Sequence, residues 1–328
     1  MEVLERLINV ALLVATLRTI APILLVALGG SFTTKAGIFN IGLEGQMLAG
    51  AFFAVLGSIW TGSAWGGVAL GILAALAFAL AFALLVVTFR ANEIVVGLAL
   101  NILAGGVTIA LMKAIFGTRG SIVGQGSVGL PKWQIPGAPA LLGPWAGLIS
   151  GHTPLVSVAF LAVPVLALLY ARTRLGLHIR VVGERPEAAE ALGISITRLR
   201  YTAALLGGLF CGLAGAHLSL GYITMFTENM SSGRGFMAVA ILIFSNGDPF
   251  KVLAGCLLFG AADAFALRLQ TLGLPSYLVL AVPYLVALLA LFALAWRSRP
   301  RLVRETAETM RRLFRSPSAD QPDPPRSS

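Results

Sequence analysis

Charged and amide side chains interrupt the long apolar runs of this 328-residue chain, and five of them are candidates for chemistry. They are Arg18, Asn40, Glu44, Gln46 and Asn101. A charged or amide side chain at membrane depth is costly unless it faces other helices or a water-filled path, so such residues indicate a transport pathway by default. The group therefore predicts movement of a solute or an ion rather than catalysis.

Each of these residues also has a structural interpretation. The glycine-rich run 36–50 would let helices approach closely, and Asn101 could bond one helix to another. A deeply placed Glu44 needs a partner or a proton, and Arg18 is the nearest candidate in the sequence. Pro22, four residues after Arg18, favours a kink or a break in its segment.

Motifs for nucleotide, metal or hydrolytic chemistry are absent from the sequence. It contains no GxxxxGK[ST] loop, no HExxH pair and no GxSxG elbow, so it does not support P-loop ATP binding or an intramembrane enzyme. His152, His178 and His217 are scattered, which is not the pattern of a metal site. Cys211 and Cys256 fall in apolar runs and are expected to be small core residues rather than a disulfide.

Residues 172–200 form the one long polar stretch between apolar segments. Within it, Pro186 suits a first helical position and Gly193 suits the position just past a helix end, so the pattern predicts a short helix over 186–192. Two helical turns span only about 10 Å, too little for a domain. We interpret the helix as a handle for another protein, the alternative being a solvated connector.

The composition predicts the fold class. The chain is 57% hydrophobic and only 12% charged, whereas soluble domains are about 25% charged. Apolar segments lie near 7–29, 38–60, 65–89, 93–116, 153–171, 201–222, 235–246, 251–271 and 276–296. We expect an all-α, polytopic helical membrane protein with about nine transmembrane helices, within a range of eight to ten. Segments 7–29 and 235–246 are irregular enough to be broken or re-entrant.

Arginine-rich connections set the predicted orientation. The stretch 172–200 and the residues after Trp296 are rich in arginine, which places both in the cytoplasm. Alternation of the spans then puts Lys35, Arg90 and Lys251 inside, and it gives an N-out/C-in topology.

Two domain-level expectations follow from the same charge pattern. Residues 1–296 form a transmembrane domain with a cytoplasmic loop at 172–200, and residues 297–328 form a basic tail that we expect to be disordered and near lipid. The net charge is +10, but the basic residues border the spans and do not form a basic domain, so no nucleic-acid partner is expected. Glu2 and Glu5 argue against a secretory signal peptide.

Four stretches together resemble the permease subunits of bacterial ABC importers, of the ribose/branched-chain amino acid type and particularly its simple-sugar and nucleoside branch. They are R-T-x-x-P from Arg18, A-G-I-F-N-I-G-L-E-G-Q-M from Ala36, F-R-A-N-E-I-V-V-G-L-A-L-N from Phe89 and G-E-R-P-E-A-A-E-A-L-G-I from Gly183. The resemblance covers nearly all of 7–296. Compared with the ten-span ribose-type permeases, the chain has few residues before its first segment, which favours nine spans.

The resemblance implies the partners. Two permeases, a heterodimer rather than a homodimer here, would form a pore in the bilayer of the bacterial cytoplasmic (inner) membrane. A separate ATPase subunit would bind ATP and Mg²⁺ beneath them, so this chain is not an enzyme and carries no cofactor or metal of its own. An extracytoplasmic substrate-binding protein would deliver the solute.

The resemblance also assigns roles to residues. Residues 184–193 would be the helix that couples to the ATPase, through Glu184, Arg185, Pro186, Glu187, Ala188, Ala189 and Gly193. Arg18, Asn40, Glu44, Gln46 and Asn101 would lie on or near the translocation path. The expected function is import of a nucleoside or simple-sugar-like solute. The alternatives are a branched-chain amino acid permease and an ion-coupled secondary transporter that uses Glu44.

Overall fold

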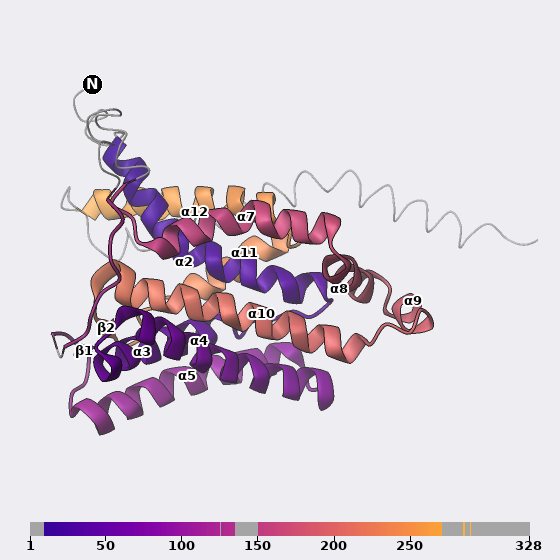
Figure 1. Cartoon of the computed structure of the whole chain (residues 1–328), viewed down its shortest axis with the longest axis horizontal. Coiled ribbons are helices and arrows are strands. Elements are labelled where there is room, and N and C mark those ends of the chain that lie inside the picture. Colours follow the sequence, from indigo (N-terminus) through magenta and orange to yellow (C-terminus); the bar gives the residue numbers. More distant parts are fainter. Residues whose placement is uncertain (1–9, 125, 135–149, 271–284, 286–288, 290–328) are drawn as a thin grey trace, which may run out of the picture. The chain divides into compact units, whose positions relative to one another are not determined.

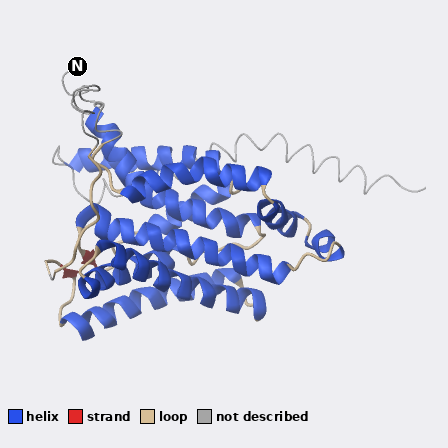
Figure 2. Cartoon of the chain, in the orientation of Figure 1, coloured by secondary structure: helices blue, strands red, loops and turns tan. Residues whose placement is uncertain are grey.

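A computed structural model describes residues 10–124, 126–134, 150–270, 285 and 289, and its regular structure is almost entirely helical (Figures 1 and 2). The chain divides into two compact units, Met1–Pro283 and Tyr284–Ser328, and every element below belongs to the first. Its α-helices are α2 (Val10–Lys35), α3 (Leu43–Thr61), α4 (Ala64–Ala83), α5 (Glu93–Phe116), α7 (Pro154–Arg172), α8 (Arg174–Glu184), α9 (Pro186–Ala191), α10 (Ile196–Ala216), α11 (Arg234–Ser245) and α12 (Pro249–Gln270). The π-helical turns η1 (Leu84–Thr88) and η3 (His217–Ile223) continue α4 and α10.

Six helical segments within the described residues are long and apolar enough to cross a membrane, judged by length and composition. They are Thr16–Lys35, Leu43–Thr61, Ala64–Thr88, Glu93–Phe116, Pro154–Arg172 and Ile196–Ile223. The all-helical, multi-span fold class is therefore confirmed. The count of nine spans stays a prediction, because nearly all of the segment 276–296 and the whole tail 297–328 lie outside the described residues.

The two irregular segments behave differently from each other. The sequence predicted a kink or a break at Pro22. The helix is not broken there, because α2 runs continuously from Val10 to Lys35 with the proline inside it. A proline removes only one backbone donor, and neighbouring helices in a bundle hold such a helix in place. By contrast, α11 has only 12 residues, as its short apolar run indicated.

The core of the bundle lies along α2 and α3, which are almost completely buried along their middle turns. Helix α10 contacts α2, α3 and α4, so the first half of the chain and the second half share this core. Helix α5 instead exposes large apolar side chains such as Ile102 and Leu103. An apolar outer face of this kind suits lipid or another membrane helix.

The two ends of the bundle carry different structures (Figure 1). Helices α8 and α9 project at one end, and the antiparallel pair of β1 (Ser121–Ile122) and β2 (Phe226–Thr227) lies at the opposite end. Lys35 is within electrostatic range of Arg180 and Lys251, and Arg90 lines a cavity that α9 also borders. The basic connections that alternation assigned to one membrane side thus gather at the α8–α9 end.

Candidate functional site

The polar cluster of the sequence lies where the chain leaves α2 and enters α3. Residues 36–42 are not helical, so their backbone groups need partners other than those of a helix. The amide of Ile38 donates to the carbonyl oxygen of Thr33 at 2.9 Å. The side-chain oxygen of Asn40 accepts from the amide of Gly42 at 2.9 Å. Buried backbone groups of a non-helical segment need such partners, because an unpaired one costs about as much as a lost hydrogen bond.

Two polar residues of α5 bind this segment from the side. The Glu93 carboxylate accepts a hydrogen bond from the amide of Phe39. About two helical turns further along α5, Asn101 accepts from the amide of Gly45 at 2.8 Å and donates to the carbonyl oxygen of Ile41 at 3.0 Å. Asn101 therefore makes the bonds between structural elements that its structural interpretation predicted.

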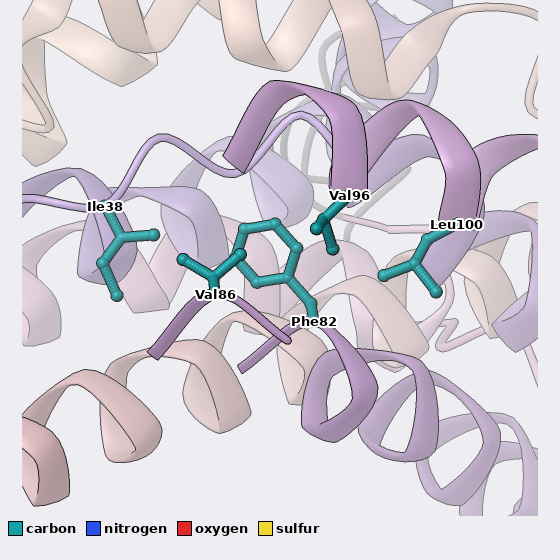
Figure 3. Close-up of a cluster of buried hydrophobic side chains, with 5 residues drawn as sticks. All are labelled: Ile38, Phe82, Val86, Val96 and Leu100. Atoms are coloured by element: carbon teal, nitrogen blue, oxygen red, sulfur yellow. The ribbon is translucent and has the colours of Figure 1, made fainter. Parts of the chain in front are cut away.

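An apolar cluster packs beside these hydrogen bonds (Figure 3). Ile38 from the non-helical segment meets Phe82 of α4, Val86 of η1, and Val96 and Leu100 of α5. Burying side chains of this size contributes about 1.5–3 kcal/mol each. The cluster and the hydrogen bonds to α5 together hold the segment in one place.

Glu44 bonds to α11, almost two hundred residues away in the sequence. One carboxylate oxygen accepts from the amide of Gly233 at 2.9 Å, and the other accepts from the amide of Gly235 at 2.6 Å. Only 6% of Glu44 is exposed. Hydrogen bonds to a charged acceptor are about twice as strong as neutral ones, and the positive end of a helix dipole favours a carboxylate. Glu44 therefore caps the short helix α11.

We name this arrangement the junction: residues 36–46 with Glu93, Asn101, Gly233 and Gly235. Several polar atoms at or near it are buried without a hydrogen-bond partner in the described part of the chain. They are both amide atoms of the Gln46 side chain, the Asn40 amide nitrogen and the Ser231 hydroxyl. A buried unpaired polar group costs about 1–3 kcal/mol, so these atoms are suited to bind water or a polar solute.

The expected pairing of Glu44 with Arg18 is wrong. Arg18 donates to the carbonyl oxygen of Gly151 at 3.2 Å, in the connection that precedes α7. The junction thus brings together Asn40, Glu44, Gln46 and Asn101, whereas Arg18 belongs to a separate site. The sequence indicated the ionisable residues but not their partners, and it missed the hydrogen bond that Glu93 makes.

The predicted helix at 186–192 is present as α9, one residue shorter. It ends in a Schellman motif: Gly193 has φ +73°, its amide donates to the Glu190 carbonyl oxygen, and the Ile194 amide donates to the Ala189 carbonyl oxygen. Pro186 takes the first helical position. The capped end explains how so short a helix keeps its shape.

The exposed side chains of α9 differ in part from the residues that were expected to contact the ATPase. Ala188, Ala191 and Leu192 are exposed, and 74% of Leu192 is accessible. Ala189 is completely buried, so it anchors α9 to the protein and does not present its side chain to a partner. Sequence spacing alone did not fix which alanine faces inward on so short a helix.

Helix α8, which leads into α9, was not predicted. Gly176, Ile179 and Val182 are its buried residues. Their spacing of three residues is typical of one helix face and was the available signal. The charged residues around them concealed that face.

Comparisons with known proteins cover both the junction and α9. A family model described as "Branched-chain amino acid transport system / permease component" matches residues 12–291. The guanosine ABC transporter permease protein NupQ of Bacillus subtilis is 36% identical over 84% of this chain and 89% of its own length. The nucleoside ABC transporter permease protein NupC of Lactococcus lactis is 32% identical over 75% and 78%. The Haloferax volcanii protein TsgC13, provisionally named a glucose ABC transporter permease, is 36% identical over 80% and 79%.

Each of these organisms also has a second, less similar relative of this chain. In Bacillus subtilis it is another guanosine permease protein, at 28% identity, and in Lactococcus lactis another nucleoside permease protein, at 25%. In Haloferax volcanii it is a glucose permease protein, at 30%. In each of these three organisms the chain is thus more similar to one of the two relatives than to the other.

We expect Glu44→Gln to destabilise the chain and to reduce transport. The glutamine offers one acceptor oxygen where two backbone donors converge, and a hydrogen bond to a charged group contributes about 1.5–3 kcal/mol. The midpoint of thermal unfolding in detergent should fall. Glu228→Gln is the matched control, because Glu228 makes one exposed hydrogen bond to the amide of Gly120. Equal midpoints for the two variants would contradict the capping role of Glu44.

Proposed function

The chain belongs to the family described as the branched-chain amino acid transport system permease component, and on that premise we propose that it imports a nucleoside or a simple sugar as the membrane subunit of an ABC transporter. It is a multi-pass protein of the cytoplasmic membrane and a transport subunit rather than an enzyme. The observation that carries the proposal is the family match over 12–291, supported by relatives at 32–36% identity that are named for guanosine, nucleosides or glucose.

The proposed assembly has three kinds of partner. An ATPase would bind ATP and Mg²⁺ and contact α9 from the cytoplasm, and an extracytoplasmic protein would deliver the solute. A second, related permease would complete the pore, and the paired relatives in three organisms support a heterodimer. The orientation in this proposal is N-out/C-in, with the α8–α9 end in the cytoplasm.

The junction is the proposed intramembrane polar site for the solute. Glucose and the ribose of a nucleoside share a hydroxylated ring, which needs hydrogen-bond donors and acceptors along its path. The unpaired amide of Gln46 and the Asn40 nitrogen offer both kinds of group. Glu44 and Asn101 support the site by fixing the backbone around it.

A close approach of Gly183 to the backbone of Lys35 and Gly37 links α9 to the junction. A side-chain carbon at Gly183, in the last turn of α8, would lie 2.1 Å from the carbonyl oxygen of Lys35 and 2.9 Å from the amide nitrogen of Gly37. Real side-chain carbons do not approach backbone this closely, so α8 rests directly on the turn that follows α2. A displacement of α9 would therefore reach residues 36–46 through rigid contacts, and Glu44 would pass it to α11.

ATP-dependent uptake tests the proposed function. Cells that contain this chain and its partners should accumulate labelled guanosine or glucose, and accumulation should stop when ATP is depleted. Uptake that survives ATP depletion but collapses with an ion gradient would favour the secondary transporter instead. Labelled leucine as the preferred solute would favour the amino acid permease. Uphill transport by the purified chain alone in liposomes would contradict an ABC permease.

Leu192→Lys should weaken binding of the ATPase. Burying one leucine contributes about 1.5–3 kcal/mol, which corresponds to a loss of affinity of roughly 10- to 150-fold. Leu177→Lys is the matched control, because Leu177 is an exposed leucine of the neighbouring helix α8. Copurification of the ATPase measures the effect. Equal copurification with both variants would contradict α9 as the docking helix.

Gly183→Ala should uncouple hydrolysis from transport. The added methyl group separates α8 from the turn at Gly37, while α9 keeps its exposed surface for the ATPase. We expect ATP hydrolysis by the assembled transporter to continue and the number of solutes moved per ATP to fall several-fold. Gly106→Ala on α5 is the control, because nothing lies within 4 Å of its added carbon. A proportional loss of hydrolysis and transport would indicate destabilisation only.

A further inference from the structure

A small cavity at the end opposite α9 brings together cationic and hydrogen-bond-donating groups. Its volume is about 60 Å³, and six of its lining residues have polar side chains: Arg18, Lys132, His152, Thr153, His217 and Tyr222. They come from α2, from the connection 117–152, from the start of α7 and from η3. No carboxylate is among the residues that line it, so its polar lining is suited to a negative ligand.

Arg18 has no anionic partner in the described part of the chain. Its guanidinium group donates to the neutral carbonyl oxygen of Gly151, and the ion pair found among the described residues joins Arg180 to Glu184. The connection 117–152, which reaches the cavity through Lys132 and His152, contains no aspartate or glutamate. A partly buried cation without compensation is costly. An anion in the cavity would remove that cost.

The walls of the cavity are held in position by hydrogen bonds. His217 is only 2% exposed, and its Nδ1 lies 3.1 Å from the Thr153 hydroxyl. The backbone of Trp133 donates to the carbonyl oxygen of His152 at 2.8 Å, which fixes the segment that enters α7. His217 also begins a π-helical turn, a feature that is frequent at functional sites. The site is thus preformed rather than created by a ligand.

The volume limits the ligand to a small ion. Liquid water occupies about 30 Å³ per molecule, so the cavity has room for a few waters or one small ion, and it is too small for a nucleoside or a sugar. We propose that this cavity binds a small inorganic anion of the chloride class. The bound anion neutralises Arg18 and ties together the outer ends of α2, α7 and η3. This inference is independent of the solute that the protein transports.

Unfolding of the purified full-length chain tests the proposal. The midpoint of thermal unfolding should be higher in sodium chloride than in sodium gluconate at equal ionic strength. The expected difference is on the order of 5 °C when the chloride concentration is far above its dissociation constant. In crystals soaked with bromide, an anomalous peak should lie beside Arg18 and His217. Equal midpoints in the two salts, or water alone at the site after a bromide soak, would overturn the proposal.

Three variants separate a specific site from a general salt effect. Arg18→Gln should abolish the difference between the two salts, and Lys132→Gln, at an exposed position, should raise the chloride concentration at half-effect several-fold. Arg119→Gln is the control, because Arg119 is exposed and does not line the cavity. If Arg18→Gln fails to fold, the Lys132→Gln variant and the anomalous bromide peak still test whether the cavity binds an anion. A salt difference that persists unchanged in both cavity variants, or a cavity filled only by a carboxylate of a partner protein, would contradict the assignment.

Discussion

Backbone that leaves a helix where other helices bury it has little access to water, so the protein itself must satisfy its hydrogen bonds. Residues 36–42 are such a segment, and the positions of several other elements follow from it. The Glu93 and Asn101 side chains bond it to α5, and Ile38 fits the apolar cluster between α4 and α5. Because these bonds are specific in direction, they fix how α2, α3 and α5 lie relative to one another.

The same segment explains why one helix of the bundle can be short. A 12-residue helix such as α11 cannot span about 30 Å of hydrocarbon, so its first turn begins inside the protein with unbonded amides. Glu44 accepts from two of them. The amides stabilise the buried carboxylate of Glu44, and the carboxylate gives these amides the acceptors that they would otherwise lack. A discontinuous helix and a buried acid are therefore one feature of the structure.

Local features of the sequence could be predicted, whereas partners distant in the chain could not. Hydropathy predicted the ends of the described spans to within about five residues, because burial in lipid depends on a run of neighbouring apolar residues. The exception is α2, whose start differs from the prediction and which continues past Gly29. The ends of α9 were predictable from Pro186 and Gly193, whose backbone preferences are intrinsic. The bonds from Glu44 to α11 were not, since no periodicity connects positions almost two hundred residues apart. The exposed and buried sides of α9 depend on packing against the rest of the chain.

The separation of Glu44 from Arg18 bears on how the protein couples energy to transport. A carboxylate that carries an ion or a proton across the membrane has to change its bonding during each cycle. Here both oxygens of Glu44 accept from backbone amides at the start of α11, so releasing them would break two hydrogen bonds to a buried carboxylate. That cost opposes ion coupling through Glu44. It is compatible with a cycle in which Glu44 and α11 move together while the energy enters at the opposite side of residues 36–42, through α8 and α9.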